Sequence, residues 1–132
     1  YRSLERKDGQ FHMLEWALRR AQCPQMVRFL REDESFIICH DDTGGIECGM
    51  HGHLGINGAR GNPKQFAKMG RKANTGHTHS AQIVNGVYVA GISAALRQNY
   101  NRGPSSWSHS HVVTYGNGKR AIITTWKGKW RA

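Results

Sequence analysis

Two pairs of histidines in glycine-rich surroundings carry the strongest chemical signal in this sequence. The pairs are His51 with His53, in Gly-Met-His-Gly-His, and His77 with His79, in Gly-His-Thr-His-Ser. In a regular strand, residues two apart point to the same face, so each pair would present two rings together. Neutral imidazole binds zinc, copper, iron and nickel, and it also serves manganese in mixed sites. The four rings predict a metal centre, whereas a single His-x-His is more often an ordinary surface pair.

The length and the charge limit what the chain can be. The 132 residues fit one domain spanning 1–132. Nineteen Lys and Arg residues against nine Asp and Glu residues give a formal net charge of +10. Such an excess favours a polyanionic partner bound through its phosphates, and the alternative is that the charge serves solubility alone.

Three further features indicate the cellular location of the protein. The three cysteines are an odd number, which fits a reducing compartment better than a disulfide framework. The sequence contains no apolar run of about 18 residues, and its first ten residues are polar and charged. We therefore expect a cytoplasmic protein without a membrane partner, in the host cell if a phage encodes it.

Three helices are expected. Apolar residues at helical spacing predict an amphipathic helix over about 10–22. Pro24 to Leu30 predicts a second short helix, with proline in its first turn. Asn62-Pro63 is typical of an N-cap followed by proline at the first helical position, which predicts a third helix that ends near Gly70.

Strands dominate the remainder. Ser35–Asp41 and Ile46–His51 flank Thr43-Gly44-Gly45 and predict a hairpin, and the glycine-rich stretch Gly52–Gly61 predicts a loop. Two Asn-Gly turns predict two more hairpins, pairing 82–84 with 87–90 and 112–115 with 121–126. The fold class expected is mixed α/β with α+β character.

The order of these motifs resembles the C-terminal half of the calcineurin-like metallophosphoesterases, and most closely the phage-type members that include DNA-degrading enzymes. The matching features are a strand entering Gly-Met-His-Gly-His, a basic glycine loop with a short helix, Gly-His-Thr-His-Ser, and a hairpin ending in Val87–Gly91. The resemblance covers roughly residues 36 to 92. The segment from Tyr100 to Arg131 resembles the tail of the same subgroup.

The resemblance implies half of an αββα sandwich with a two-metal centre at the strand ends. In that pattern His51 and His77 bind one ion and His79 binds the other. His53 lies beside the ions, and we assign it a catalytic role. Manganese is the expected metal, with zinc or iron as alternatives.

The sequence departs from the family's pattern in its N-terminal ligands. It has no Asp-x-His pair, no Gly-Asp and no Gly-Asn-His. We therefore interpret the chain as the C-terminal portion of such a domain, which would need an N-terminal half or another chain to supply Asp and Asn ligands. Alone it should bind metal weakly and be catalytically impaired.

Further residues are candidates for binding phosphate or nucleic acid. Asn57 and Arg60 lie among glycines, which suits phosphate contact, although a plain surface turn fits equally well. Lys72 precedes the second histidine pair. His109 and His111 form a third His-x-His, which would line a nucleic-acid groove or simply be a polar strand face.

Two functions follow from these features. The first is a metal-dependent phosphodiesterase, most consistent with a DNA nuclease of phage type. The second is a non-catalytic basic module that binds nucleic acid. The sequence leaves open whether the chain forms a homo-oligomer.

Overall fold

The computed structural model describes residues 13–22, 30 and 34–130, in two units that span 1–31 and 32–132. The first unit contains helix α1 (Met13–Arg20), which lies within the range predicted for the first helix. The guanidinium of Arg20 sits 5.4 Å from the ring of Trp16, one turn earlier. The predicted helix at 24–30 falls almost entirely outside the described residues.

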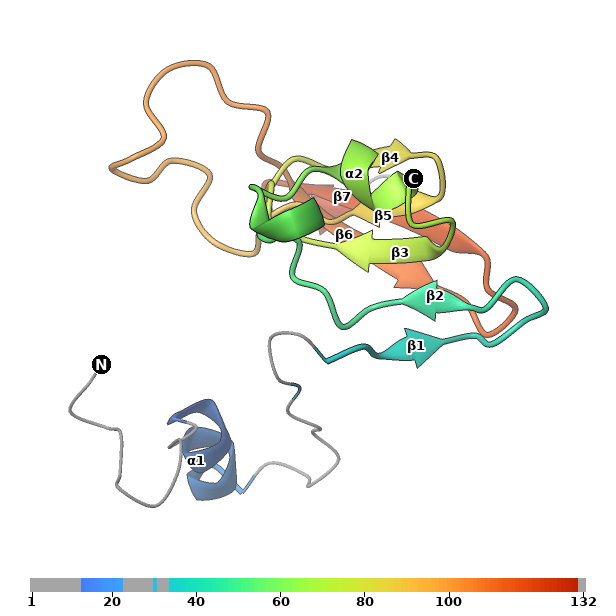
Figure 1. Cartoon of the computed structure of the whole chain (residues 1–132). Helices are drawn as coiled ribbons and strands as arrows, with labels where there is room; N and C mark the ends of the chain where they lie inside the picture. The colour runs from blue at the N-terminus through green and yellow to red at the C-terminus, as the bar shows by residue number, and fades with distance from the viewer. Residues whose placement is uncertain (1–12, 23–29, 31–33, 131–132) are drawn as a thin grey trace. The chain divides into compact units, whose positions relative to one another are not determined.

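The second unit contains a five-stranded mixed sheet in the order β1-β2-β3-β5-β4 (Figure 1). Its strands are β1 (Ile37–Ile38), β2 (Ile46–Glu47), β3 (Lys72–Thr75), β4 (Gln82–Val84) and β5 (Val87–Val89). The pairs β1–β2 and β4–β5 are antiparallel hairpins, whereas β2–β3 and β3–β5 are parallel. Three neighbouring strands therefore end at the same edge of the sheet.

One short helix covers part of this sheet. Helix α2 (Pro63–Ala67) begins at Asn62, whose side chain accepts a hydrogen bond of 2.9 Å from the Lys64 N–H. The helix places Phe66, which is 4% exposed, against Ala73, Val87 and Val89, each fully buried. This apolar cluster fixes β3 and β5, and with them the segments that follow.

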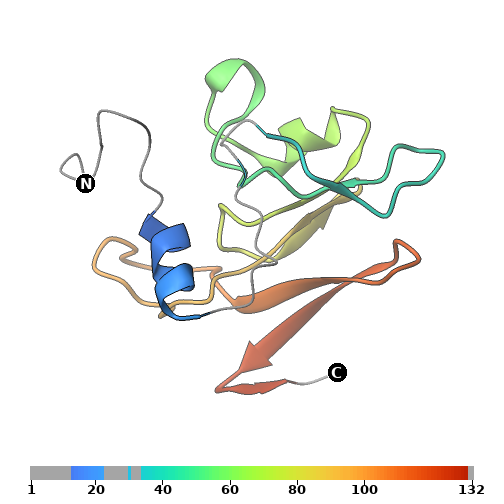
Figure 2. The ribbon, with the colours of Figure 1, turned by 90° about the horizontal axis from the view of Figure 1, so that it is seen from below.

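The second sheet is antiparallel, in the order β6-β7-β8, and lies behind the first in Figure 1. It consists of β6 (His109–Thr114), β7 (Arg120–Trp126) and β8 (Lys129–Trp130). The chain between β5 and β6 leaves the sheets as a long loop, drawn in orange in Figure 1 and visible from a second direction in Figure 2.

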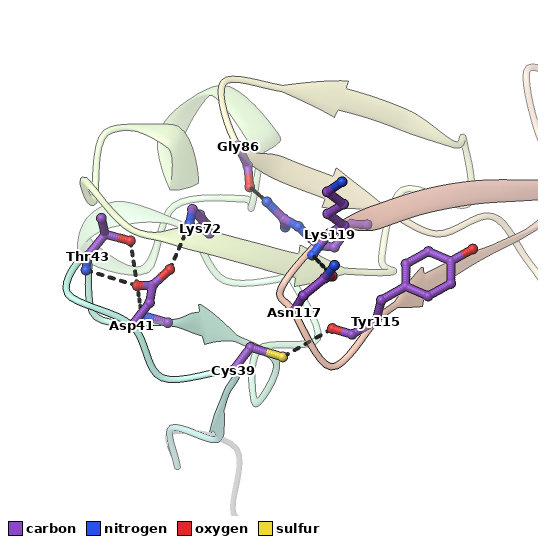
Figure 3. Close-up of polar contacts among 10 residues, drawn as sticks. Cys39, Asp41, Thr43, Lys72, Gly86, Tyr115, Asn117 and Lys119 are labelled. Atoms are coloured by element: carbon purple, nitrogen blue, oxygen red, sulfur yellow. Dashed lines mark hydrogen bonds and ion pairs between the residues drawn. The ribbon is translucent and has the colours of Figure 1, made fainter.

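Polar contacts join the two sheets. Arg120 on β7 donates hydrogen bonds to the carbonyls of Ala73 and Gly86, both at 2.8 Å, and to the Asn74 side chain at 3.0 Å. Asn74 in turn donates to Thr114 on β6 at 3.1 Å. At the edge strand, the thiol of Cys39 donates to the Tyr115 carbonyl (Figure 3). One charged side chain thus connects β7 to both β3 and the β4–β5 turn.

The mixed α/β class and the three hairpins are confirmed. The helix after Asn62-Pro63 is confirmed as well, although it ends at Ala67 rather than near Gly70. The loop at 52–61 contains a 3₁₀ turn (Ile56–Gly58) that was not predicted, and β3 and β8 were also missed. A single domain over 1–132 stays a prediction. No helix in the described part of the chain is long and apolar enough to cross a membrane.

Candidate metal centre

Both histidine pairs follow the carboxyl ends of parallel strands. The segment after β2 carries His51, and the segment after neighbouring β3 carries His77. In Figure 1 the arrowheads of these two strands point to the same side. The N–H groups of Gly76 and His77 both donate to the His51 carbonyl, each at 3.1 Å. The main chain therefore holds the two histidine segments side by side.

Three imidazole rings gather there. The ring centroids of His51 and His77 are 5.2 Å apart, those of His51 and His53 are 5.5 Å apart, and those of His53 and His77 are 6.0 Å apart. The Nδ1 atom of His77 lies 3.3 Å from the Nε2 atom of His51. Two of the three predicted metal ligands are therefore adjacent, and His53 completes a cluster of three.

The spacing between the nearest ring nitrogens of His51 and His77, which is also that of a hydrogen bond between the rings, is compatible with a tetrahedral metal ion. Two nitrogens that each lie about 2.0–2.1 Å from such an ion are roughly 3.3 Å from one another, which is the spacing found here. Nevertheless, no group of three or more His, Cys, Asp or Glu side chains within the described residues has its donor atoms arranged to hold an ion. Among the described residues, the spacing of metal ligands therefore holds for the nearest ring nitrogens of His51 and His77. His53 is a neighbouring imidazole, a side chain that can also bind a metal ion.

His79 lies elsewhere. Its ring packs edge-to-face on Trp107, with a centroid separation of 4.5 Å. The backbone explains the difference from a strand, because His79 has a φ of 58°, in the left-handed region. The expected strand alternation therefore does not hold over His77–His79. Whether His79 ligates a second ion stays a prediction.

The surroundings of His77 favour the neutral form of its ring. Burial lowers the pKa of His77, and electrostatic interaction with His51, His53, Arg60 and His79 lowers it further. A neutral ring has a lone pair available for a metal ion or a proton. The lowered pKa therefore favours the neutral form of the His77 ring.

Glu47, a residue that sequence reasoning missed, anchors the segment before His51. It is 5% exposed, and its carboxylate accepts hydrogen bonds from the Ser35 hydroxyl and from the N–H groups of Phe36 (3.0 Å) and Gly49 (2.7 Å). Burial raises the pKa of Glu47, but these hydrogen bonds and the charge of Arg71 together bring it below its ordinary value. A lone carboxylate within the apolar run Ile46–Cys48 was the signal available in the sequence.

A pocket of about 610 Å³ opens beside this anchor. His51 and His53 line it, together with Glu34, Ser35, Glu47, Met50, Gly52 and Leu54. The pocket therefore combines two histidines with apolar side chains such as Met50 and Leu54, and it is large enough for a small molecule or a chain end.

Gly61 closes the loop that carries His53, and its substitution is expected to disturb the cluster. The Gly61 N–H donates to the His53 carbonyl at 2.7 Å, and a Cβ at Gly61 would overlap the Gly52 carbonyl. Gly61→Ala should destabilise the fold by about 1–3 kcal/mol, as forced overpacking does. Gly76→Ala is the matched control because a Cβ there meets nothing within 4 Å. Urea unfolding checks this, and equal midpoints for the two variants would contradict it.

The predicted phosphate-binding residues are dispersed. The charge of Arg60 helps to lower the pKa of His77. Asn57, with a φ of 57°, lies in the exposed 3₁₀ turn of the same loop. Lys72 begins β3, at the far end of the strand from His77, and forms an ion pair of 3.0 Å with Asp41 (Figure 3). The structure therefore separates Lys72 from the cluster and leaves Arg60 near it.

The third His-x-His is part of a regular strand. His109 and His111 belong to β6, and the Ser110 side chain between them is buried and bonded to Thr124 at 2.8 Å. The Nε2 atom of His109 lies 2.9 Å from the Ala94 carbonyl, while His111 is exposed. His109 thus braces the long loop, and His111 remains open to solvent.

The charge of the chain is strongly segregated. All nine acidic residues lie at or before Glu47, and twelve of the nineteen Lys and Arg residues follow it. The histidine segments, both Asn-Gly hairpins and the long loop are therefore built without a single carboxylate side chain. Any polyanion that approaches them meets no acidic residue from 48–132.

Comparison with known proteins gives one informative relative. The chain is 51% identical over 133 aligned residues to protein A1 of Escherichia phage T5. The alignment covers this whole chain but 23% of that protein, so the chain spans about a quarter of its relative's length. No family model and no solved structure matches. The chain is therefore similar throughout to part of a phage protein.

Proposed function

We propose that this chain contributes part of the active site of a phage-type nuclease. Such a nuclease would be a metal-dependent phosphodiesterase that acts on DNA in the host cytoplasm. The observation that carries the proposal is the meeting of His51, His53 and His77 beyond the ends of two parallel strands. The resemblance of these segments to the metallophosphoesterase blocks and the acid-free basic surface support it.

Each residue has a role that its position allows. His51 and His77 would hold a divalent ion, which when bound polarises a phosphoryl oxygen and supplies hydroxide at neutral pH. His53 lies close enough to move a proton to or from a group in the pocket. Arg60 offers a guanidinium for a phosphate oxygen near His77.

A two-metal centre needs ligands from outside residues 48–132. That stretch has no carboxylate, and the carboxylate of Glu47 is already bonded to Ser35, Phe36 and Gly49. We propose that the bridging Asp and the Asn ligand belong to another part of a longer protein or to a partner chain. Residues 1–132 alone should therefore show weak hydrolysis of a generic phosphodiester with manganese.

Metal binding tests the site directly. His51→Ala and His77→Ala are each expected to weaken Co²⁺ or Zn²⁺ binding by roughly tenfold to a hundredfold, because each removes a ligand. His111→Ala is the matched control, since this exposed histidine lies on β6. Isothermal titration and the visible absorption of Co²⁺ measure the effect. Equal affinities for the three variants would refute the proposal.

The same titration compares the two candidates for the next ligand. The ring geometry favours a loss of affinity in His53→Ala, whereas the family pattern assigns that loss to His79→Ala. A chain that binds no metal yet binds DNA would instead support the second function, a non-catalytic nucleic-acid-binding module, which the charge segregation favours.

A further inference from the structure

The loop between β5 and β6 is long but braced. Residues 93–108 contain no helix or strand, and loops of this length in compact domains are usually functional. At one end Ile92 donates to the Ser108 carbonyl at 2.9 Å, and at the other Ser108 donates to the His79 carbonyl at 3.3 Å. The hydroxyls of Ser80 and Ser106 are 2.7 Å apart. The loop is therefore fastened to the second histidine segment.

Internal hydrogen bonds fix the tip of the loop. The Asn101 side chain donates to the Leu96 carbonyl at 2.7 Å and accepts from the Gln98 N–H at 2.6 Å. These bonds hold the chain on both sides of Tyr100 before any ligand arrives. A preorganised loop loses less conformational entropy on binding than a flexible one.

Aromatic rings run from the tip to the histidine segment. Tyr100 is 69% exposed and packs edge-to-face on Trp107 at 5.7 Å, and Trp107 packs on His79 at 4.5 Å. An exposed tyrosine that is supported from one side is suited to stack on a flat, unpaired ring. Unpaired nucleobases use such platforms, whereas bases within a duplex are already stacked on one another.

Two cationic residues flank Tyr100 in the sequence. Arg97 and Arg102 are exposed, and both line a hollow of about 600 Å³ together with Gln98, Asn99, Asn101, Gly103 and Pro104. No acidic residue occurs anywhere in 48–132. The hollow, whose lining residues precede and follow Tyr100 in the sequence, therefore offers guanidinium and amide donors, which suit phosphate oxygens.

We propose that this loop binds single-stranded nucleic acid, with Tyr100 stacked on one base and with Arg97 and Arg102 on the flanking phosphates. The row of aromatic rings that begins at Tyr100 continues through Trp107 to His79, two residues from His77 in the sequence. Delivery of the strand to that pair rests on the proposed function, but binding at the loop does not, because it requires no metal.

Fluorescence anisotropy in EDTA tests the proposal, with a labelled single-stranded DNA 12-mer and its duplex as probes. Tyr100→Ala should weaken single-strand binding roughly 5- to 150-fold, the range for loss of one stacked base. Tyr100→Phe, which keeps the ring, should bind like the unmodified chain. Tyr115→Ala is the matched control, since Tyr115 is 52% exposed in the β6–β7 turn.

Measuring the affinity for duplex DNA distinguishes the contribution of base stacking from that of charge. Tyr100→Ala should leave duplex affinity unchanged, whereas Arg97→Ala combined with Arg102→Ala should reduce the salt dependence for both probes. Equal affinities of Tyr100→Ala and Tyr115→Ala for the single strand, or an equal loss for the duplex, would overturn the proposal. Failure of His77→Ala to alter metal binding would refute the metal site and leave this result standing.

Discussion

Affinity for duplex DNA is expected to fall roughly thousandfold or more between 50 and 200 mM salt. Each neutralised phosphate contributes about −0.9 to the slope of log affinity against log salt, and six or more contacts give a loss of that size. Twelve cationic side chains with no carboxylate among them over 48–132 make this number of contacts accessible. Sequence preference should be weak, since nothing in the described residues resembles a recognition helix.

Titration of labelled duplex and single strands at several salt concentrations measures the slope. Arg60→Ala and Arg71→Ala should each lower its magnitude by about 1 on duplex DNA. Lys72→Ala should lower it less, because Asp41 already pairs with that ammonium at 3.0 Å. A flat response to salt would assign the basic surface to solubility or to a protein partner instead.

Arg120→Met is expected to destabilise the fold by about 3–5 kcal/mol. The substitution removes three charge-assisted hydrogen bonds, each contributing roughly 1.5–3 kcal/mol before solvent screening reduces the total. It also leaves the acceptors on Ala73, Asn74 and Gly86 without this donor. The guanidinium lies 4.1 Å from the centre of the Tyr88 ring, so a favourable cation–π contact is lost as well.

Two variants make this result specific to the guanidinium. Lys119→Met removes a neighbouring, exposed charge and should shift the unfolding midpoint very little. Arg120→Lys keeps the charge but loses the planar fork, so it should recover only part of the stability. If Arg120→Met unfolds at the same denaturant concentration as Lys119→Met, the two sheets do not depend on this side chain.

Local signals predicted the elements well because the relevant physics lies within a few residues. Asn85 and Gly86 both have positive φ, at 44° and 84°, as the tight turn of a two-residue hairpin requires. Asn62 caps α2 through its own side chain. Steric and hydrogen-bonding preferences of this kind can be read from adjacent letters in the sequence.

The parallel pairing of β2, β3 and β5 was not accessible in the same way. Its register joins Ile46 to Lys72 and Ala73 to Val87, and no turn residue encodes such distant partners. Burial of a shared apolar face selects that arrangement. The adjacency of His51 and His77, on which the candidate site depends, was expected from the chemistry of the histidine pairs and from a family resemblance, and not from any predicted pairing of strands.

The histidine cluster contains His51, His53 and His77, whereas the predicted metal ligands were His51, His77 and His79. The backbone conformation accounts for this difference. Strand alternation would place the two rings of each His-x-His on one face, but Gly52 has a φ of 100° and His79 a φ of 58°. The first pair nevertheless keeps its rings 5.5 Å apart, while the second places His79 on Trp107. The position of the His79 ring involves contact with Trp107, in a loop far along the sequence, which no local spacing rule contains.

The absence of acidic side chains after Glu47 also fixes how this part of the molecule responds to acid. A typical protein surface buffers added protons on its carboxylates, so attraction between opposite charges is lost first. Here the stretch 48–132 contains no Asp or Glu side chain, so acidification has no attraction between opposite side-chain charges to remove within it. The positive side chains of 48–132 therefore repel one another without internal compensation, and a bound polyanion, such as the nucleic acid proposed above, would supply the counter-charge that these residues do not carry themselves.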